Sequence, residues 1–221
     1  MSATAKICGL REPRHAVLAA THGARWVGMV FFPPSPRHVE PEQARAIVNV
    51  LPPAVDAVGV MVNPDDEAVR IAVTSGLGAL QLHGRETPER IAAVRRIAGV
   101  PVIKALGIST RDDARRAKSF SEAADMILFD ACPPEGASRP GGNARAFDWP
   151  VLMGLDLPLP WILSGGLTPA NVGAAIASSG ATAVDVSSGI ERSLGEKDES
   201  LIVDFLAAVR APVDRSAPVL Q

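Results

Sequence analysis

Two residues able to exchange protons each end a short apolar run of the sequence. Cys8 closes the segment Ala-Lys-Ile-Cys, and Asp130 closes Met-Ile-Leu-Phe-Asp. Taken singly, Cys8 is better interpreted as a small buried hydrophobe and Asp130 as an acceptor for loop N–H groups. On one face of a protein, however, the two would supply an acid and a base for proton transfer. A thiol ionises near pH ~8.5, so Cys8 would need a cation or dipole beside it, and Lys6 is close in sequence.

Two glycine-rich segments have the composition of an anion site. Trp161-Ile-Leu-Ser-Gly-Gly-Leu-Thr-Pro turns through Gly165 and Gly166, and Val184-Asp-Val-Ser-Ser-Gly-Ile-Glu places Ser188 and Gly189 after the next apolar run. Glycine lets backbone N–H groups approach an anion, and a helix N-terminus adds a favourable dipole. One such turn is weak evidence, because glycine is common in turns. The two together predict a small phosphorylated substrate.

Three further polar side chains follow apolar runs. Arg37 ends the loop Phe-Phe-Pro-Pro-Ser-Pro-Arg, whose prolines stiffen the chain. A fixed guanidinium suits a carboxylate, although a solvated loop arginine fits the sequence equally well. Gln81 and His83 flank the end of the run Ala79–Leu82. For His83 a cavity-lining role is slightly favoured over that of a structural histidine.

These residues follow short apolar runs that alternate with amphipathic segments along the whole chain. Strands are predicted at Ala5–Gly9, Trp26–Phe31, Asp56–Val62, Ala79–Leu82, Val100–Ala105, Met126–Asp130, Trp161–Ser164 and Ala183–Ser187. Helices are predicted at Pro41–Leu51, Asp65–Ser75, Pro88–Ala98, Arg111–Ser119, Pro169–Ser178 and Glu199–Val209. Hydroxyl side chains are expected to cap three of these helices, at Thr87, Thr110 and Thr168.

The repeating strand–helix units predict an α/β fold with a parallel sheet. The strands are apolar and β-branched without strict alternation, as expected when helices cover the sheet. Eight such units favour a closed (β/α)8 TIM barrel, and no glycine-rich turn of a doubly wound dinucleotide fold follows the first strand. In such barrels the active site lies at the carboxyl ends of the strands. The residues singled out above should therefore gather at one end of the barrel.

Composition limits the class of protein. The 221 residues, 47% of them hydrophobic, suit one domain over residues 1–210, with a flexible tail at 211–221. The 22 basic and 24 acidic residues are dispersed, which argues against nucleic acid as a partner. No apolar stretch reaches the ~18 residues that cross a membrane, and no signal peptide is evident, so a cytoplasmic protein is expected. The two cysteines and four histidines lack the spacing of a metal site.

An ordered set of motifs resembles the phosphoribosylanthranilate isomerase family. Single motifs such as Gly-Gly-Leu recur in many barrels, but the set runs in order from residue 6 to about residue 210. The matching segments are Lys-Ile-Cys-Gly-Leu at 6–10, Phe-Phe-Pro-Pro-Ser-Pro-Arg at 31–37, Gln-Leu-His-Gly at 81–84, Leu-Phe-Asp-Ala at 128–131, Gly-Gly-Asn at 141–143, Phe-Asp-Trp at 147–149, Ser-Gly-Gly-Leu at 164–167 and Asp-Val-Ser-Ser-Gly-Ile-Glu at 185–191.

The resemblance implies a reaction and a role for each site residue. The family rearranges N-(5-phosphoribosyl)anthranilate to 1-(2-carboxyphenylamino)-1-deoxyribulose 5-phosphate in tryptophan biosynthesis, without metal or organic cofactor. By this resemblance Asp130 is the general acid and Cys8 the general base, while Arg37 contacts the anthranilate carboxylate and Asp185 lies beside the sugar hydroxyls. We expect a monomer or a homodimer. Backbone groups expected to bind the phosphate are those around Gly142, Gly165, Gly166, Ser188 and Gly189.

Several positions depart from the family pattern, including Arg14 and His15, which replace acidic residues often seen there. Other functions compete with this interpretation. Ala144 replaces a common glycine, and Cys132 often aligns with a lysine; we expect neither to be catalytic. A bifunctional isomerase shared with histidine synthesis would use two aspartates, so Cys8 argues against it. A metal-dependent epimerase would need His and Asp ligands at several strand ends. A barrel that only binds a ligand would not need both Cys8 and Asp130.

Overall fold

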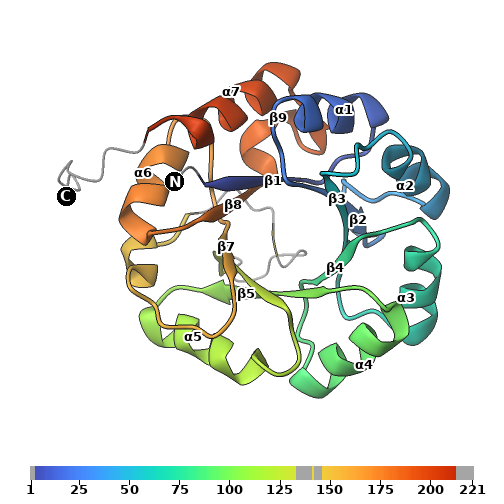
Figure 1. Ribbon diagram of the computed structural model, residues 1–221, viewed down its shortest axis with the longest axis horizontal. Helices are drawn as coiled ribbons and strands as arrows, with labels where there is room; N and C mark the ends of the chain where they lie inside the picture. Colours follow the sequence, from blue (N-terminus) through green and yellow to red (C-terminus); the bar gives the residue numbers. More distant parts are fainter. Residues whose placement is uncertain (1–2, 133–140, 142–145, 213–221) are drawn as a thin grey trace.

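The computed structural model describes residues 3–132, 141 and 146–212. Eight parallel strands close into a barrel in chain order, with β8 paired to β1, and helices surround it (Figure 1). The predicted (β/α)8 barrel is therefore confirmed. The strands are β1 (Thr4–Cys8), β2 (Trp26–Phe31), β3 (Asp56–Met61), β4 (Ala79–Leu82), β5 (Val102–Ile108), β6 (Met126–Ala131), β7 (Trp161–Leu163) and β8 (Ala183–Val186).

Most helices begin where the sequence places a cap. The Thr87 and Thr110 hydroxyls each accept a backbone N–H of the first turn, as predicted. The predicted cap at Thr168 is wrong: its N–H is bound to Asn171 Oδ1 at 2.7 Å, and the helix begins only at Val172. The helices are α1 (Pro13–Thr21), α2 (Pro41–Val48), α3 (Asp66–Val73), α4 (Pro88–Ala98), α5 (Arg111–Arg115), α6 (Val172–Ser179) and α7 (Glu199–Arg210), with short 3-10 turns η1 (Arg116–Phe120), η2 (Trp149–Leu152) and η3 (Ser188–Ile190).

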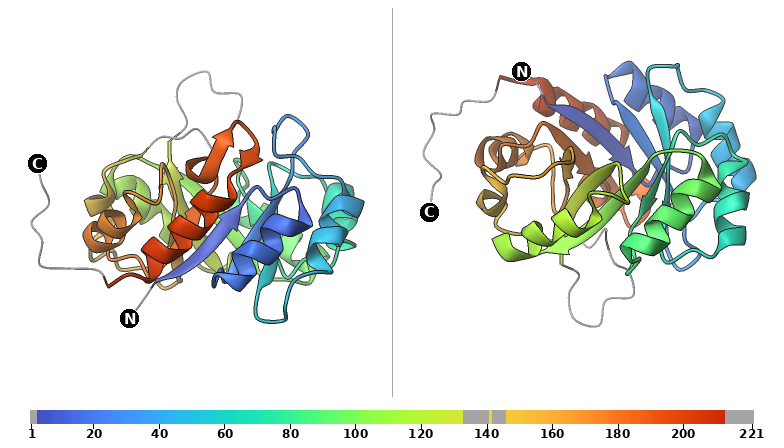
Figure 2. Two further views of the ribbon diagram at one scale, coloured as in Figure 1. Left: turned by 90° about the horizontal axis from the view of Figure 1, so that it is seen from above. Right: turned by 60° about the horizontal axis from the view of Figure 1, so that its bottom comes forward.

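Several elements are absent from the predicted set, among them α1, η2 and a hairpin outside the barrel sheet. After η3 the chain forms a two-stranded antiparallel hairpin from β9 (Glu191–Ser193) and β10 (Glu196–Lys197). Figure 2 shows this hairpin and the loop after β2 at the same end of the barrel. Both follow the carboxyl end of a strand, where the site residues are expected.

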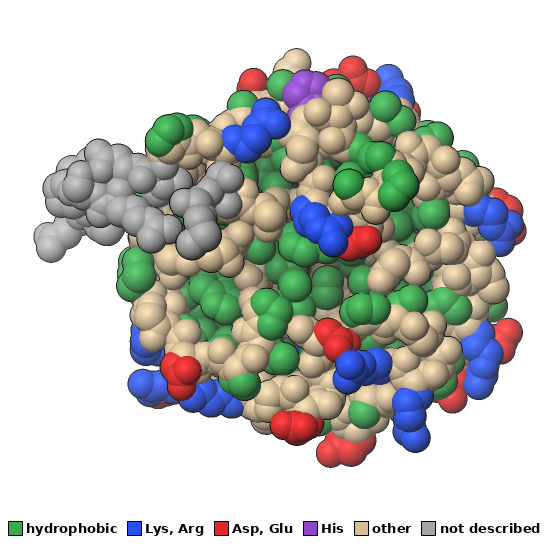
Figure 3. All heavy atoms as spheres, viewed as in Figure 1, with side chains coloured by type: hydrophobic (Ala, Val, Ile, Leu, Met, Phe, Trp, Pro, Cys, Tyr) green, Lys and Arg blue, Asp and Glu red, His purple; other side chains and the backbone are tan. Residues whose placement is uncertain are grey.

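Two apolar layers hold the barrel together. One lies between strands and helices, and the other fills the barrel interior with residues that include Val58, Ile103, Leu128 and Ile162. Figure 3 views the face where the strands begin, and hydrophobic side chains fill its centre inside a rim of mixed charge. The interior is thus closed at this end, which leaves the opposite end for a ligand. Within the described ranges, no helix has the length and apolar character needed to cross a bilayer.

Candidate active site

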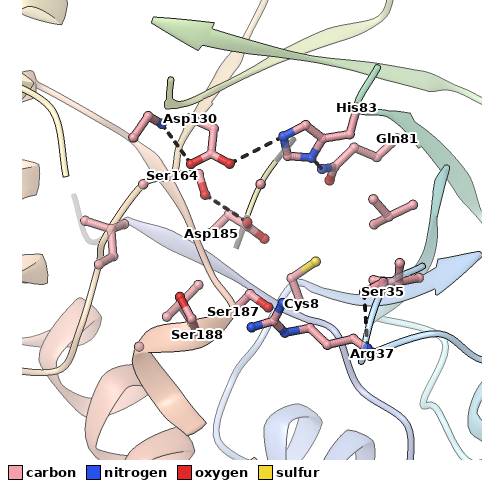
Figure 4. Close-up of a pocket in the computed structure, with 18 of the residues that line it drawn as sticks. Cys8, Ser35, Arg37, Gln81, His83, Asp130, Ser164, Asp185, Ser187 and Ser188 are labelled. Atoms are coloured by element: carbon pink, nitrogen blue, oxygen red, sulfur yellow. Dashed lines mark hydrogen bonds and ion pairs between the residues drawn. The ribbon is translucent and has the colours of Figure 1, made fainter. Parts of the chain in front are cut away.

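A cavity that is open to solvent lies at the carboxyl ends of the strands. It brings together residues from β1, β2, β3, β4, β6 and β8 and from loops that follow the strands, including the loop after β7 (Figure 4). Gly142 lies outside the described residues. The other predicted site residues all line this cavity: Cys8, Arg37, Gln81, His83, Asp130, Gly165, Gly166, Asp185, Ser188 and Gly189.

Cys8 and Asp130 face the cavity from opposite sides, one at the end of β1 and the other near the end of β6 (Figure 4). Asp130 Oδ1 accepts the N–H of Ala131 at 2.8 Å. Asp130 Oδ2 lies 3.4 Å from His83 Nε2, which is within ion-pair distance but does not meet hydrogen-bond geometry. Among the described residues, Oδ2 therefore accepts no hydrogen bond.

Gln81 and His83 form the wall beside Asp130. Gln81 Nε2 lies 3.2 Å from His83 Nδ1, and Gln81 Oε1 is buried without a hydrogen-bond partner among the described residues. Gly141 packs over this wall, since a Cβ there would lie 2.6 Å from His83 Cε1 and 2.8 Å from Asp130 Oδ2. A buried acceptor without a partner costs free energy, so Gln81 is suited to a polar group of a ligand.

An ion pair lies beneath the Cys8 thiol. Lys6 Nζ is 2.8 Å from Asp185 Oδ1 and both side chains are buried, while Ser164 Oγ donates to Asp185 Oδ2 at 3.1 Å. A Cβ on Gly28 of β2 would lie 2.8 Å from Cys8 Sγ and 3.1 Å from Lys6 Nζ. Thus Gly28 makes room for the thiol and the ammonium side by side.

This arrangement shifts both pKa values. Burial raises the pKa of the Cys8 thiol, and the Lys6 charge opposes that shift by favouring the thiolate. Burial disfavours the Lys6 ammonium, but Asp185 and Cys8 more than offset it, and the pKa of Lys6 lies above its ordinary value. Lys6 therefore remains a cation beneath the thiol.

Arg37 is held in a second buried cluster. Its Nε and Nη2 donate to Glu191 Oε1 and Oε2 at 2.6 and 2.8 Å, and only 3% of Arg37 is exposed. The alternative of a solvated loop arginine is therefore wrong. Lys197 Nζ donates to Glu191 Oε1 at 2.8 Å and to the Ser187 carbonyl at 2.8 Å. Burial opposes ionisation of Glu191, but the hydrogen bonds of Arg37 and Lys197 lower its pKa to about 2.

The loops after β7 and β8 form the glycine-rich side of the cavity. Gly165 and Gly166 have φ of +91° and +65°, where other residues are strained. Among the described residues, no acceptor takes the N–H of either glycine. The two loops touch, because a Cβ on Gly189 would overlap the Leu167 carbonyl. Free amides beside the first residues of η3 suit an anion.

The cavity also contains residues that the sequence analysis did not assign. The cavity is lined by Ser35, Ser164 and Ser187. Three charged residues bind the side chains or backbone of lining residues without lining the cavity themselves: Lys6, Glu191 and Lys197. Lys6 and Glu191 lie inside recognisable motifs, whereas Lys197 stands in a polar segment with no distinguishing pattern. Cys132 is half-buried and does not line the cavity.

Comparison with known proteins assigns the chain to a family. Residues 5–208 match the family model described as N-(5'phosphoribosyl)anthranilate (PRA) isomerase. The N-(5'-phosphoribosyl)anthranilate isomerase of Paramagnetospirillum magneticum is 49% identical over 211 residues, which covers 95% of this chain and 98% of that protein. That of Rhodospirillum rubrum is 48% identical, covering 93% and 96%.

Solved structures agree in fold and sequence. The phosphoribosyl anthranilate isomerase of Thermotoga maritima superposes with a TM-score of 0.82 at 39% identity, covering 94% of this chain and 98% of that one. A phosphoribosyl anthranilate isomerase in complex with reduced 1-(o-carboxyphenylamino)-1-deoxyribulose 5-phosphate gives 0.78 at 38% identity, with the same coverage. The protein therefore belongs to the N-(5'-phosphoribosyl)anthranilate isomerase family.

Proposed function

We propose that the protein converts N-(5'-phosphoribosyl)anthranilate to 1-(2-carboxyphenylamino)-1-deoxyribulose 5-phosphate, with Asp130 as general acid and Cys8 as general base. One observation carries the assignment of roles: the thiol and the carboxyl group open into one cavity from opposite sides, beside a loop pair with free backbone N–H groups. A sugar phosphate held by those amides would lie between the two proton-transfer groups.

The first step opens the sugar ring. Asp130 gives a proton from Oδ2 to the furanose ring oxygen, and the bond from C1 to that oxygen breaks. The lone pair of the anthranilate nitrogen forms the C1=N bond of an iminium cation. Oδ2 suits this step because Oδ1 is already bound by the Ala131 N–H. The positive nitrogen makes the proton on C2 more acidic.

The second step moves the C2 proton. The Cys8 thiolate removes it, and the electron pair of the C–H bond forms C1=C2 while the iminium nitrogen becomes neutral. The resulting enolamine gains a proton at C1 while the hydroxyl group on C2 loses its proton, and the C2 ketone forms. The Lys6 ammonium, held by Asp185, favours the thiolate in this step. These steps call on no metal or organic cofactor.

Binding is divided among three groups. Backbone N–H groups near Gly165, Gly166, Ser188 and Gly189 hold the phosphate, and Arg37 binds the carboxylate. Asp185 lies beside the sugar hydroxyls. A free thiol used as a base suits a reducing compartment, which supports a cytoplasmic location. The enzyme acts as a monomer or a homodimer.

A fluorescence assay that follows loss of the substrate's emission tests these roles. Cys8→Ala and Asp130→Asn should each lower kcat by ~10²- to 10⁴-fold with a modest change in KM, because each removes a proton-transfer group. Cys132→Ser is the matched control and should retain kcat, since Cys132 does not line the cavity. Near-normal kcat for Cys8→Ala would remove the thiol from the mechanism. Comparable turnover of the histidine-pathway aminoaldose would point to the bifunctional enzyme.

A further inference from the structure

We infer that Glu191 and Lys197 of the β9–β10 hairpin are positioning residues. They orient the Arg37 guanidinium, and they hold the loop after β8, proposed above to bind the phosphate, at a fixed distance from Arg37. The inference rests on the proposed function, because it takes Arg37 to bind the substrate carboxylate. It adds a role for two residues that do not line the cavity and for a hairpin that lies outside the barrel sheet.

The first observation is the edge of Arg37 that Glu191 occupies. A guanidinium has five N–H donors in a plane, and Glu191 takes one from Nε and one from Nη2. Among the described residues, nothing accepts a hydrogen bond from Nη1. The free edge, Nη1 together with the second N–H of Nη2, can grip both oxygens of a carboxylate. Glu191 thereby selects an end-on approach of the ligand.

The second observation is charge. The cluster buries two cations, Arg37 and Lys197, against one anion, Glu191. Their side chains are 2–4% exposed, so water offsets little of the excess positive charge. A ligand carboxylate at the free edge of Arg37 would neutralise this excess. The excess positive charge of this cluster therefore suits one more anion at the free edge of Arg37.

The third observation links the cluster to the loop after β8. Lys197 Nζ donates to the Ser187 carbonyl at 2.8 Å and lies 3.3 Å from Ser187 Oγ. Gly9 lies between Arg37 and Ser187, because a Cβ there would be 2.6 Å from Arg37 Cδ and 3.0 Å from Ser187 Oγ. Gly195 at the turn of the hairpin packs equally closely on the Pro36 carbonyl. These contacts thus fix the distance between Arg37, which is proposed to bind the carboxylate, and the loop after β8, which is proposed to bind the phosphate.

The test compares two ligands that differ in one group. Reduced 1-(o-carboxyphenylamino)-1-deoxyribulose 5-phosphate carries the carboxylate, and the corresponding phenylamino compound lacks it. Calorimetric Kd values for both give a selectivity ratio for the carboxylate. In Glu191→Gln this ratio should fall on the order of tenfold, because charge-assisted positioning of Arg37 is lost. Glu196→Gln, on the exposed side of the same hairpin, should leave the ratio unchanged.

The direction of the effect separates positioning from simple electrostatics. Removing a negative charge beside a carboxylate site would by Coulomb's law tighten binding, so an increased or unchanged ratio in Glu191→Gln would overturn the inference. Glu191→Asp provides a second variant that keeps the charge and shortens the reach, and it too should lower the ratio. Lys197→Met should weaken both ligands. If the wild type does not bind the carboxylated ligand, the proposed function fails, whatever the variants do.

Discussion

At the scale of single residues, the thiol of Cys8 stands between two opposing influences. Burial favours the neutral thiol, while the Lys6 ammonium directly beneath it favours the thiolate. The charged groups that act on it are Lys6 on the same strand, Asp185 on β8 and Lys197 on the hairpin. Since Asp185 binds Lys6 at 2.8 Å, it fixes the cation in place and also reduces its effect on the sulfur.

Removing Lys6 should therefore move the ionisation of Cys8 to higher pH. In a Cys132→Ser background only Cys8 reacts, and its rate of alkylation by iodoacetamide follows the thiolate fraction. Lys6→Met should shift the midpoint of that rate upward by about one pH unit or more, because an adjacent opposite charge is lost.

Two further variants make this result interpretable. Lys104→Met removes an equally buried lysine that pairs with Glu86 on the far side of the sheet, and it should leave the midpoint unchanged. Lys6→Met/Asp185→Asn removes both charges and protects against misfolding caused by an unpaired Asp185. A midpoint that does not move in either Lys6 variant would show that Lys6 does not act on the thiol.

The sequence predicted the residues at strand ends and missed most of their partners. Cys8, Asp130 and the two glycine-rich turns follow apolar runs, so their place in the barrel could be inferred from the fold alone. Arg37 and Glu191 are 154 positions apart in the sequence, and no local sequence pattern predicts that they pair. Burial of Arg37 could not be inferred either, because a proline-rich loop looks exposed.

At the scale of secondary-structure elements, strand β2 contributes to the site through a glycine, Gly28, which has no side chain. Gly28 pairs with Cys8 in the sheet and leaves the space that the sulfur and the Lys6 ammonium occupy. The site is thus shaped by an element that offers no functional group at this position. Any Cβ there would have to displace the thiol or bend the strand.

Gly28→Ala should therefore damage catalysis while every proposed catalytic group is kept. A displacement of the thiol by a fraction of an ångström to an ångström should lower kcat on the order of 10²-fold. Gly173→Ala on α6 is a matched control, because a Cβ there meets nothing within 4 Å, and it should leave kcat unchanged. Steady-state kinetics with circular dichroism would check both variants. Unaltered kcat in a folded Gly28→Ala protein would show that the strand yields easily.

The eight barrel strands have apolar patterns and were predicted, whereas the polar β9–β10 hairpin was not. The β9–β10 hairpin consists of five polar residues around Leu194 and Gly195, and its strands are held by the buried cluster rather than by an apolar face. Strand β5 extends to Ile108, beyond the predicted end at Ala105, because its pairing with β6 continues to Ala131. The segment predicted as one helix at Arg111–Ser119 divides into α5 and η1.

At the scale of the whole molecule, the buried cluster contributes to stability as well as to binding. The folded-state pKa of Glu191 is about 2, below its ordinary value of 4.5. A depressed carboxylate pKa stabilises the folded state above the unfolded pKa, and this contribution is lost as pH falls through the folded pKa. The loss due to Glu191 therefore falls between about pH 4.5 and about pH 2.

Glu191→Gln should accordingly be less stable than the wild type near neutral pH, with the difference shrinking through that acidic window. Urea unfolding at pH 7, 4 and 3 would measure the free energy of unfolding of both proteins. Glu67→Gln, on the exposed surface of α3, serves as the control for loss of one carboxylate. A difference between wild type and Glu191→Gln that stays constant from pH 7 to pH 3 would contradict the expected linkage.

The overall architecture was predictable because each strand–helix unit repeats the same signal. Eight apolar runs separated by amphipathic helices leave few alternatives to a closed barrel, and all eight strands overlap their predicted positions. Family membership followed from motifs spread across nearly the whole chain. Contacts between distant loops, such as Gly189 against Leu167, depend on how the units close together and carry no such signal.

The cluster of Arg37, Glu191 and Lys197 spans the seam of the barrel. Arg37 follows β2 and Glu191 follows β8, so their ion pair reaches over the end of β1, where the first and last strands meet. The junction of β1 and β8 is therefore stabilised by this ion pair between side chains as well as by backbone hydrogen bonds. A ligand carboxylate bound to the free edge of Arg37 would further stabilise the cluster of Arg37, Glu191 and Lys197. Amide hydrogen exchange in β1 and β8 should therefore slow when such a ligand is bound.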